Sequence, residues 1–308
     1  MDAANMAPKI AVEPAGSSDH LAAAVRAGGG EVVALADAEA LVWTDARGSL
    51  ALGAALSARP DLAWVQLPFA GIEPLVGQLD HERIWTCGKG VYAEPVAEHA
   101  LGLALAGMRH LAGYARQKTW TAPAGVNLLG ARVVIVGGGE ITRSLLRLLG
   151  PFNCNITVVR RSAQDIPGVS RVVTSDALIE VVADADLVVL TLALTPQTVG
   201  IIDASVLAAM PQHAWLVNVA RGGHIVTDDL VAACSQGSIG GAALDVTDPE
   251  PLPAAHPLWS LPNVIITPHI ANTPEMGRPL LAARVTENVR RWAAREPLEG
   301  LVDVDLGY

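Results

Sequence analysis

Three residues whose side chains could together bind a substrate and transfer a proton follow predicted strands in the second half of this 308-residue chain. Arg221 follows an apolar run and precedes two glycines, Glu250 stands between two prolines, and His269 follows a proline. A histidine beside a carboxylate can donate and accept a proton near neutral pH. An arginine can bind a carboxylate while it polarises a neighbouring carbonyl. Each residue alone would more often be structural, but together they predict a catalytic site that needs no metal.

A glycine turn between a predicted strand and a predicted helix, in the run 131–150, favours nucleotide binding. Glycines permit a tight turn and let backbone N–H groups approach a pyrophosphate at the positive end of the helix. The third position of the G-x-G-x-x-G pattern is Thr142, and a G-x-G alone is also compatible with an ordinary tight turn. The predicted cofactor contacts at this turn are Gly137, Gly139, Glu140 and Ile141.

The end of the next predicted strand indicates which cofactor the turn would bind. Dinucleotide folds that use NAD place an acidic residue about 20 residues after the turn, where it accepts the ribose 2′-hydroxyl. This chain has Arg160, Arg161 and Ser162 there instead. Arginine can bind a 2′-phosphate through charge-assisted hydrogen bonds, so the sequence favours NADP over NAD. NAD stays possible, because two arginines at a strand end can simply be solvated.

The elements that must position these residues alternate between short β-branched runs and stretches compatible with helices. This alternation predicts parallel strands joined by crossover helices. Many of the runs are apolar without alternation, as strands buried on both faces should be. The predicted strands cover 9–14, 31–37, 62–68, 83–89, 131–137, 155–161, 185–192, 214–220, 241–246 and 263–269.

Two long helices are predicted, at 94–117 and 274–295. The first has small apolar residues nearly all round, so we expect it to be buried at a domain junction. The second follows the last predicted strand, and we expect it to return to the N-terminal domain. The sequence therefore predicts a discontinuous substrate-binding domain, 1–98 plus 274–308, around a dinucleotide-binding domain at 99–273.

The composition excludes several classes of protein. The net charge is −10, and no uncharged apolar run approaches the about 20 residues that a membrane span requires. We therefore expect neither a nucleic-acid partner nor a membrane partner. The N-terminal residues are neither basic nor followed by an apolar segment, and the three cysteines are widely spaced. These features favour a cytoplasmic protein with reduced thiols.

From LAWVQLPFAGIEPL onward, the chain resembles the D-isomer-specific 2-hydroxyacid dehydrogenase family. The resemblance lies in the motifs VIVGGGEI, LTPQTVGIID, VNVARGG, DVTDPEPLP and TPHIAN, in that order. It implies an α/β fold with two doubly wound parallel-sheet domains, a flavodoxin-like substrate domain and a Rossmann cofactor domain, with a cleft between them. It also implies a homodimer, since family members commonly associate through the cofactor domain.

The resemblance further implies roles for particular residues. Asp245 matches the residue that contacts the nicotinamide carboxamide. Backbone N–H groups around Ala70 and Gly71 match those that hold the substrate carboxylate, which Arg221 would also bind. The family's catalytic residues map to Arg221, Glu250 and His269.

These features together favour an NADPH-dependent reductase of a small 2-keto acid, of the glyoxylate or hydroxypyruvate type, that yields the D-2-hydroxy acid. One alternative is an enzyme similar to phosphoglycerate dehydrogenase. No additional basic cluster for a phosphate is evident near the substrate loop, which disfavours it. Another alternative is a non-catalytic nucleotide sensor on the same scaffold, which would not need to keep an acid–base pair.

Overall fold

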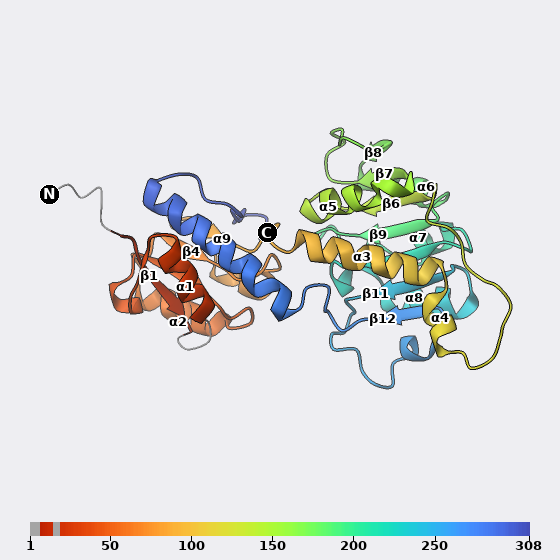
Figure 1. Cartoon of the computed structure of the whole chain (residues 1–308), viewed down its shortest axis with the longest axis horizontal. Helices are drawn as coiled ribbons and strands as arrows, with labels where there is room; N and C mark the ends of the chain where they lie inside the picture. The colour runs from red at the N-terminus through yellow and green to blue at the C-terminus, as the bar shows by residue number, and fades with distance from the viewer. Residues whose placement is uncertain (1–6, 15–18) are drawn as a thin grey trace. The chain divides into compact units, whose positions relative to one another are not determined.

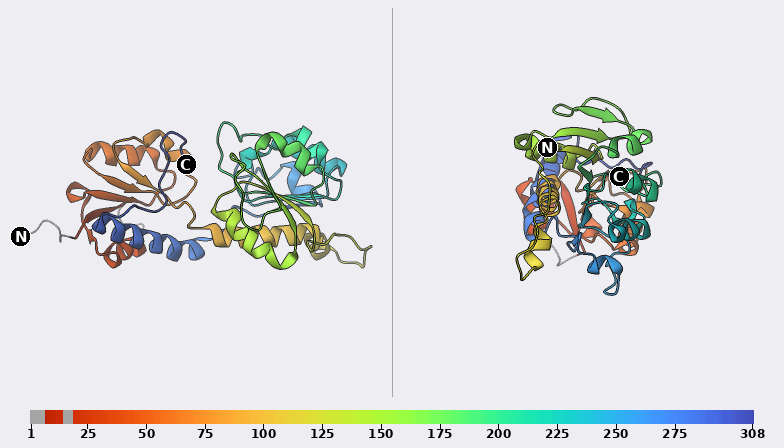
Figure 2. Two further views of the ribbon diagram at one scale, coloured as in Figure 1. Left: turned by 90° about the horizontal axis from the view of Figure 1, so that it is seen from above. Right: turned by 90° about the vertical axis from the view of Figure 1, so that its right-hand side faces the viewer.

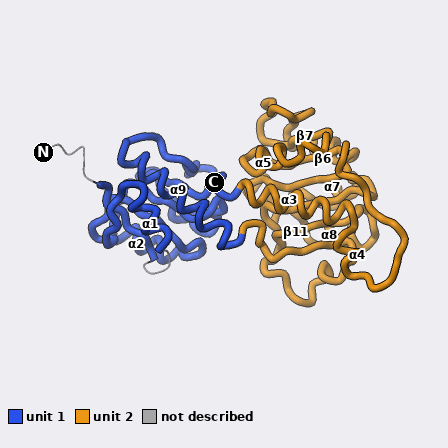
Figure 3. Tube along the Cα trace, viewed as in Figure 1, with its two compact units in different colours: residues 1–92, 273–308 blue, residues 93–272 orange. Residues whose placement is uncertain are grey.

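The computed structural model describes residues 7–14 and 19–308. The chain forms two compact units, which Figure 3 distinguishes by colour. Unit 1 comprises Met1–Tyr92 and Thr273–Tyr308, and unit 2 comprises Ala93–Asn272. The two ends of the chain therefore belong to one unit, and the second unit is a continuous insertion between them.

Unit 1 contains a parallel sheet of five strands in the order β2-β1-β3-β4-β5. This is the strand order of flavodoxin-like folds. Most of its residues are buried, because helices cover both faces of the sheet. The strands are β1 (Lys9–Glu13), β2 (Glu31–Val32), β3 (Ala40–Trp43), β4 (Trp64–Gln66) and β5 (Ile84–Thr86).

The helices of unit 1 come from both ends of the chain, as Figure 1 shows. On one face of the sheet, α1 (Asp19–Ala27) packs beside α9 (Pro274–Ala294). On the other face lie α2 (Ser49–Ala58) and the 3₁₀ segment η3 (Glu73–Gln78). The C-terminal helix thus returns to the N-terminal strands, as expected from its place after the last predicted strand.

Unit 2 contains a parallel sheet of seven strands in the order β12-β11-β10-β9-β6-β7-β8. Within the unit this is the Rossmann order with one further strand, and the order reverses between β6 and β9. The strands are β6 (Arg132–Val136), β7 (Asn155–Val159), β8 (Arg171–Val173), β9 (Leu187–Leu190), β10 (Trp215–Asn218), β11 (Gly241–Leu244) and β12 (Val264–Ile266).

The sheet of unit 2 lies between two layers of helices, visible in the left view of Figure 2. Along β6, Val133 and Ile135 pack on one layer, and Val134 and Val136 on the other. Burial on both faces explains why the strand sequences do not alternate with polar residues. The helices are α3 (Ala93–Met108), α4 (Leu111–Arg116), α5 (Glu140–Leu149), α6 (Leu178–Val182), α7 (Ala204–Ala209) and α8 (Thr227–Gln236).

The two doubly wound parallel sheets confirm the predicted fold class. Each predicted strand contains an observed one, but β3 and β8 were not predicted. The run at 31–37 forms a strand at its first two residues only, because the chain turns into a 3₁₀ segment at Leu35–Asp37. The central position beside β1 belongs instead to β3, a buried run of four residues.

The helix predicted at 94–117 is interrupted in the structure. His110 stands between α3 and α4 with φ of 56°, a left-handed conformation that a right-handed helix cannot include. All of α3 belongs to unit 2, so the predicted boundary at 98/99 falls inside it. Which unit binds substrate and which binds dinucleotide stays a prediction. Within residues 7–14 and 19–308, no helix combines the length and apolar character needed to cross a membrane.

Candidate active site

The carboxyl ends of three neighbouring strands carry polar residues that the sequence selected for function. In the sheet of unit 2, β10, β11 and β12 are adjacent and parallel. Arg221 follows β10, Asp245 follows β11 and His269 follows β12. Doubly wound sheets bind ligands at the carboxyl ends of their strands. The topology therefore gathers these residues at the edge where a ligand is expected.

His269 and Glu250 form a hydrogen-bonded pair. Nδ1 of His269 lies 2.7 Å from Oε1 of Glu250, and the two side chains are 50% and 37% exposed. A carboxylate in this place orients the imidazole ring and complements the positive charge that a protonated ring carries. With Nδ1 engaged, Nε2 is the ring atom that can exchange a proton with a bound molecule.

A buried carboxylate organises the loop that carries His269. Asp245 is 2% exposed, and its Oδ1 accepts hydrogen bonds from the Thr267 hydroxyl at 2.6 Å and the Ile270 N–H at 3.0 Å. Its Oδ2 accepts one from the Ala271 N–H at 3.0 Å, and its backbone carbonyl accepts one from the His269 N–H at 2.8 Å. The backbone around the histidine is thereby held to a single residue at the end of β11.

His99 of α3, which is partly exposed, completes the cluster around Asp245. Its Nε2 lies 3.0 Å from the Thr267 hydroxyl oxygen and 3.3 Å from Oδ1 of Asp245. Burial raises the pKa of Asp245, but the hydrogen bonds from His99, Thr267 and two backbone N–H groups together outweigh it and hold that pKa below its ordinary value. Asp245 is therefore a carboxylate at neutral pH. Its contact with the nicotinamide stays a prediction.

The turn that carries Arg221 is fixed by its neighbours. The side-chain amide of Asn218, a buried residue, donates to the Arg221 carbonyl at 2.8 Å. A Cβ on Gly222 would lie 2.0 Å from backbone atoms of Thr247. Only glycine therefore allows the arginine turn to pack against the segment that follows β11. This close approach is the structural reason for the first glycine after the arginine.

The glycine turn lies between β6 and α5, at the point where the strand order of the sheet reverses. Gly137 has φ of 123°, and a Cβ there would lie 2.5 Å from the Thr191 hydroxyl oxygen. This position thus requires glycine for both its conformation and its space. A Cβ on Gly139 would meet nothing within 4 Å, so the outer side of the turn is open.

The first residues of α5 follow this turn. Glu140 begins the helix and forms an ion pair with Arg143, whereas Ile141 is half-buried and packs against the core. The amino end of a helix presents backbone N–H groups and a positive dipole to an anion. The glycine turn and α5 together can therefore hold a phosphate group.

The arginines predicted to select the cofactor follow β7, the strand beside β6. Arg160 is half-buried, and its side chain lies across the glycine turn, because a Cβ on Gly138 would be 3.1 Å from its Cδ and Nε. Arg161 and Ser162 are exposed. A cation therefore stands beside the glycine turn at the position where an NAD-binding site would have a carboxylate.

Ala70 and Gly71 belong to unit 1, in the loop between β4 and η3. Ala70 is exposed and Gly71 is half-buried. The hydroxyl of Tyr92 donates to the carbonyl of Pro68 at 2.9 Å, which anchors the start of the loop. The binding of a substrate carboxylate by the backbone of this loop stays a prediction.

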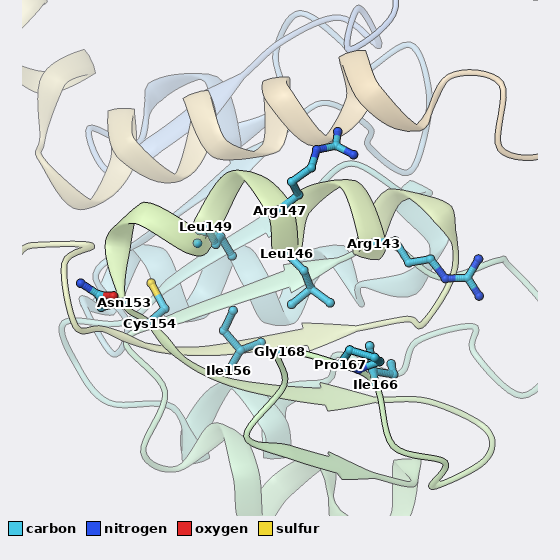
Figure 4. Close-up of a pocket in the computed structure, with 11 residues that line it drawn as sticks. Arg143, Leu146, Arg147, Leu149, Asn153, Cys154, Ile156, Ile166, Pro167 and Gly168 are labelled. Carbon is cyan, nitrogen blue, oxygen red and sulfur yellow. The ribbon is translucent and has the colours of Figure 1, made fainter.

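A cavity of about 600 Å³ lies beside α5, as Figure 4 shows, but it is separate from these residues. The cavity is lined by the second half of α5, the start of β7 and the loop at 166–168, with Leu146 and Ile156 among its apolar side chains. None of the predicted site residues lines it. The start of β7 is at the opposite end of the strand from Arg160, so this cavity is not part of the candidate site.

Sequence reasoning missed the contributions of His99, Thr267 and Thr191. His99 offers one signal, since it is an imidazole in an otherwise small and apolar helix. Thr267 stands two residues before His269, close enough in sequence to be suspected of supporting it. Thr191 gives no such signal. Its role depends on contact with Thr142, which is 49 residues away in the sequence.

Comparison with known proteins agrees with this geometry. A family model described as the NAD binding domain of D-isomer specific 2-hydroxyacid dehydrogenases matches residues 101–271. A protein of Corynebacterium melassecola, described as an uncharacterized protein in the proB 3′ region, is 41% identical over 256 residues, which are 80% of this chain and 84% of that protein.

Two further relatives have informative descriptions. Glyoxylate/hydroxypyruvate reductase A of Yersinia enterocolitica is 37% identical over 176 residues, 56% of this chain and 55% of the reductase. This chain thus spans about half the length of the reductase that it matches. The crystal structure of a D-isomer specific 2-hydroxyacid dehydrogenase from Xanthobacter autotrophicus Py2, in complex with NADPH and MES, has a TM-score of 0.85 at 26% identity and covers 99% of this chain and 100% of that one.

The family match covers more than half of the chain and includes the segments that carry the glycine turn and the strand ends of unit 2. The resemblance predicted from the motifs is therefore confirmed, as is the predicted class of enzyme, an oxidoreductase acting on CH–OH donors. The chain belongs to the D-isomer specific 2-hydroxyacid dehydrogenase family.

Proposed function

We propose that this protein reduces a small 2-keto acid of the glyoxylate or hydroxypyruvate type to the D-2-hydroxy acid, with NADPH as the preferred cofactor. The observation that carries the proposal is the 2.7 Å pair of His269 and Glu250 at the strand ends that also present Arg221. The name of the Yersinia relative supports the substrate class, and the bound cofactor of the Xanthobacter structure supports NADPH.

His269 is proposed to be the proton donor in reduction. When hydride reaches the carbonyl carbon of a 2-keto acid, the carbonyl oxygen becomes an alkoxide that needs a proton. Glu250 accepts a hydrogen bond from Nδ1–H of the protonated ring, and Nε2–H delivers its proton to that oxygen, which leaves a neutral imidazole. In the oxidation direction, the same Nε2 accepts the proton from the hydroxyl group.

Arg221 is proposed to bind the substrate and polarise its carbonyl. A guanidinium group has several donors in one plane, so it can bind a carboxylate oxygen and a keto oxygen at the same time. Its positive charge also stabilises the negative charge that develops on the keto oxygen during hydride transfer. The backbone N–H groups around Ala70 and Gly71 are also proposed to bind a substrate carboxylate.

The residues around the glycine turn fit NADP. Gly138 leaves space that the Arg160 side chain fills at 3.1 Å, and the outer side of Gly139 is open. Gly137, Gly139, Glu140 and Ile141 would hold the pyrophosphate through the turn and the start of α5, and Arg160, Arg161 and Ser162 would hold the 2′-phosphate. NADP in its reduced form supplies the hydride when bound.

The experiment that tests this function is NADPH oxidation, followed at 340 nm, with a panel of 2-keto acids and with NADH in parallel. Glyoxylate, hydroxypyruvate, pyruvate and 2-ketoglutarate cover small, hydroxylated, methylated and long substrates. We expect the highest kcat/KM with glyoxylate or hydroxypyruvate. The absence of turnover with every member of the panel would overturn the proposed substrate class, and a higher kcat/KM with NADH would overturn the cofactor preference.

We further propose a homodimer that associates through unit 2. Trp120, in the segment after α4, is fully exposed, and Leu111 is 53% exposed on α4. Large apolar side chains that are exposed on one copy can be buried where two copies meet. Light scattering at micromolar concentration should give twice the mass of one chain, and the mass of a single chain would refute the dimer.

A cytoplasmic location is also proposed. Cys87, Cys154 and Cys234 are free thiols, and the first and last of them are buried. Free thiols are typical of proteins that work in a reducing compartment. Cell fractionation with an antibody against the chain tests this, and recovery in an oxidising compartment would contradict it.

A further inference from the structure

Two threonines meet at the point in unit 2 where the strand order reverses. Thr142 belongs to α5 and is fully buried. Thr191 directly follows β9 and is also buried. Their hydroxyl oxygens lie 2.8 Å apart. This is the place in a doubly wound sheet where a dinucleotide binds, so the pair lies directly behind the glycine turn.

The hydroxyl pair contacts the backbone of the turn itself. The Thr142 hydroxyl is 2.9 Å from the carbonyl oxygen of Gly137, and the Thr191 hydroxyl is 3.2 Å from that of Val136. Val136 already accepts a hydrogen bond from the Thr191 N–H at 2.8 Å. Since each hydroxyl has one proton, we assign Thr191 as the donor to Thr142 and Thr142 as the donor to Gly137.

The direction of one carbonyl fixes the direction of the next N–H. The peptide bond between Gly137 and Gly138 is trans, so its C=O and N–H point in opposite directions in one plane. Because the Gly137 carbonyl points toward Thr142 in the interior, the Gly138 N–H points to the outer side of the turn. Glycine has few conformational restraints of its own, so this orientation needs an external anchor.

We infer that Thr142 and Thr191 are positioning residues for the cofactor: their hydroxyl pair anchors the Gly137 carbonyl and thereby directs the Gly138 N–H toward the pyrophosphate. The inference depends on the proposed function, since it assumes that NADPH binds at this turn. At the third position of the glycine motif, glycine normally serves close packing of helix and strand. Here a threonine takes that position, and its hydroxyl holds the turn by a hydrogen bond.

The test is direct binding of NADPH to the full chain, measured by cofactor fluorescence, with kcat and KM measured in parallel. Thr142→Val keeps the shape of the side chain and removes the hydroxyl, whereas Thr142→Ser keeps the hydroxyl. We expect the Kd for NADPH to rise about five- to tenfold in the valine variant and to stay within about twofold of the parent in the serine variant. At saturating NADPH, kcat should be little changed in both.

Thr191→Val and the double variant test the order of the two hydroxyls. Thr191 acts through Thr142, so its loss alone should raise the Kd less, by about twofold to threefold. The double variant should bind NADPH no more weakly than Thr142→Val. It replaces both partners by apolar groups of similar shape, which favours folding of the variant. Effects of the two substitutions that multiply in full would overturn the assigned order.

Thr86→Val is the matched control. Thr86 is a buried threonine of unit 1, and its hydroxyl lies 2.8 Å from both Trp64 Nε1 and Gln66 Oε1. The Thr86→Val substitution should lower the melting temperature without changing the Kd for NADPH. A parent Kd in both Thr142→Val and Thr191→Val would overturn the inference. If the parent itself failed to bind NADPH, the proposed function would fall instead, so the two failures are distinguishable.

Discussion

The two halves of the sheet in unit 2 prepare their ligand sites in different ways. At the ends of β10, β11 and β12, the groups proposed to meet a substrate are charged side chains, and buried Asp245 orders the loop beside them. At the ends of β6 and β9, the groups proposed to bind a cofactor are backbone N–H groups, and two neutral hydroxyls anchor the Gly137 carbonyl beside them. In the proposed mechanism, side-chain atoms thus transfer the proton, whereas backbone atoms of the same sheet bind the cofactor.

Because of this difference, substitutions in the two halves should have different effects on the rate and on cofactor affinity. A titratable side chain that transfers a proton has no substitute, so its loss should lower the rate by orders of magnitude and depend on pH. A backbone N–H persists through most substitutions, and its orientation is shared among several contacts. Changes to the hydroxyls that anchor the glycine turn should therefore alter affinity by smaller factors and leave the pH dependence of the rate unchanged.

The largest effect should follow from His269→Ala. This substitution removes the proposed proton donor, and we expect kcat to fall by about 10²–10⁴. Cofactor binding should be nearly unchanged, because the glycine turn lies at other strands of the sheet. Steady-state kinetics and NADPH titration together measure both quantities. Turnover close to that of the parent would show that His269 is not the proton donor. It would also contradict the proposed division between catalytic side chains and cofactor-binding backbone.

Arg160→Asp should reverse the cofactor preference. Loss of one charge-assisted hydrogen bond lowers affinity by about ten- to hundredfold, and the new carboxylate also repels a 2′-phosphate. The ratio of kcat/KM for NADPH to that for NADH should therefore fall below one. Arg171→Asp is the matched control, because Arg171 begins β8 and pairs with Glu180 at 2.8 Å. An equal change in both variants would point to general electrostatics.

Glu250→Gln should change the pH dependence of reduction. Glutamine keeps the shape of the side chain and removes its charge, so a charge-assisted hydrogen bond becomes a neutral one that is weaker by about 1 kcal/mol. We expect reductase activity to decline at a lower pH than in the parent and to be about five- to tenfold lower at pH 8. Activity–pH profiles from pH 5 to 9 measure this. Superimposable profiles would argue against the pairing.

Asp245→Asn should have the smallest of the four effects. The quantity that it changes is the stability of the fold. Hydrogen bonds hold the pKa of Asp245 below its unfolded value, so its contribution is present above about pH 4 and is lost as the pH falls through the lowered pKa. The variant should lose about 1 kcal/mol of unfolding free energy at neutral pH. The difference in Tm between parent and variant should be constant from pH 7 to 5 and narrow below pH 4. A difference that widens in acid would contradict this sign.

Much of the fold could be predicted from local sequence. Strands buried on both faces, such as β6, are apolar without alternation. When helices connect such strands, a parallel sheet covered by helices on both faces is expected. The strands β3 and β8, of four and three residues, were missed, although other strands of the same length were predicted. The break at His110 was missed because one left-handed residue changes the chain direction without changing the apolar pattern.

The candidate site could be predicted as far as it depends on strand ends. Arg221 and His269 each lie a few residues after the end of a strand, and parallel topology then gathers them. The contacts of Asp245 could not be predicted, because they depend on how α3 packs and brings His99 to Thr267. The contact between the hydroxyls of Thr142 and Thr191 could not be predicted either. The sequence shows only that Thr142 replaces the third glycine of the motif.

The discontinuous first unit has a consequence for synthesis on the ribosome. One face of its sheet is completed by Leu281, Val285 and Val289 of α9, which join the core that contains Ile10 and Trp64. At roughly 5–20 residues per second, α9 emerges about 10–40 s after the first part of unit 1. During that interval the whole of Ala93–Asn272 is made, so unit 2 is the first that can complete its core. The nascent chain therefore forms the glycine turn and the loop of His269 before α9 packs on the N-terminal strands.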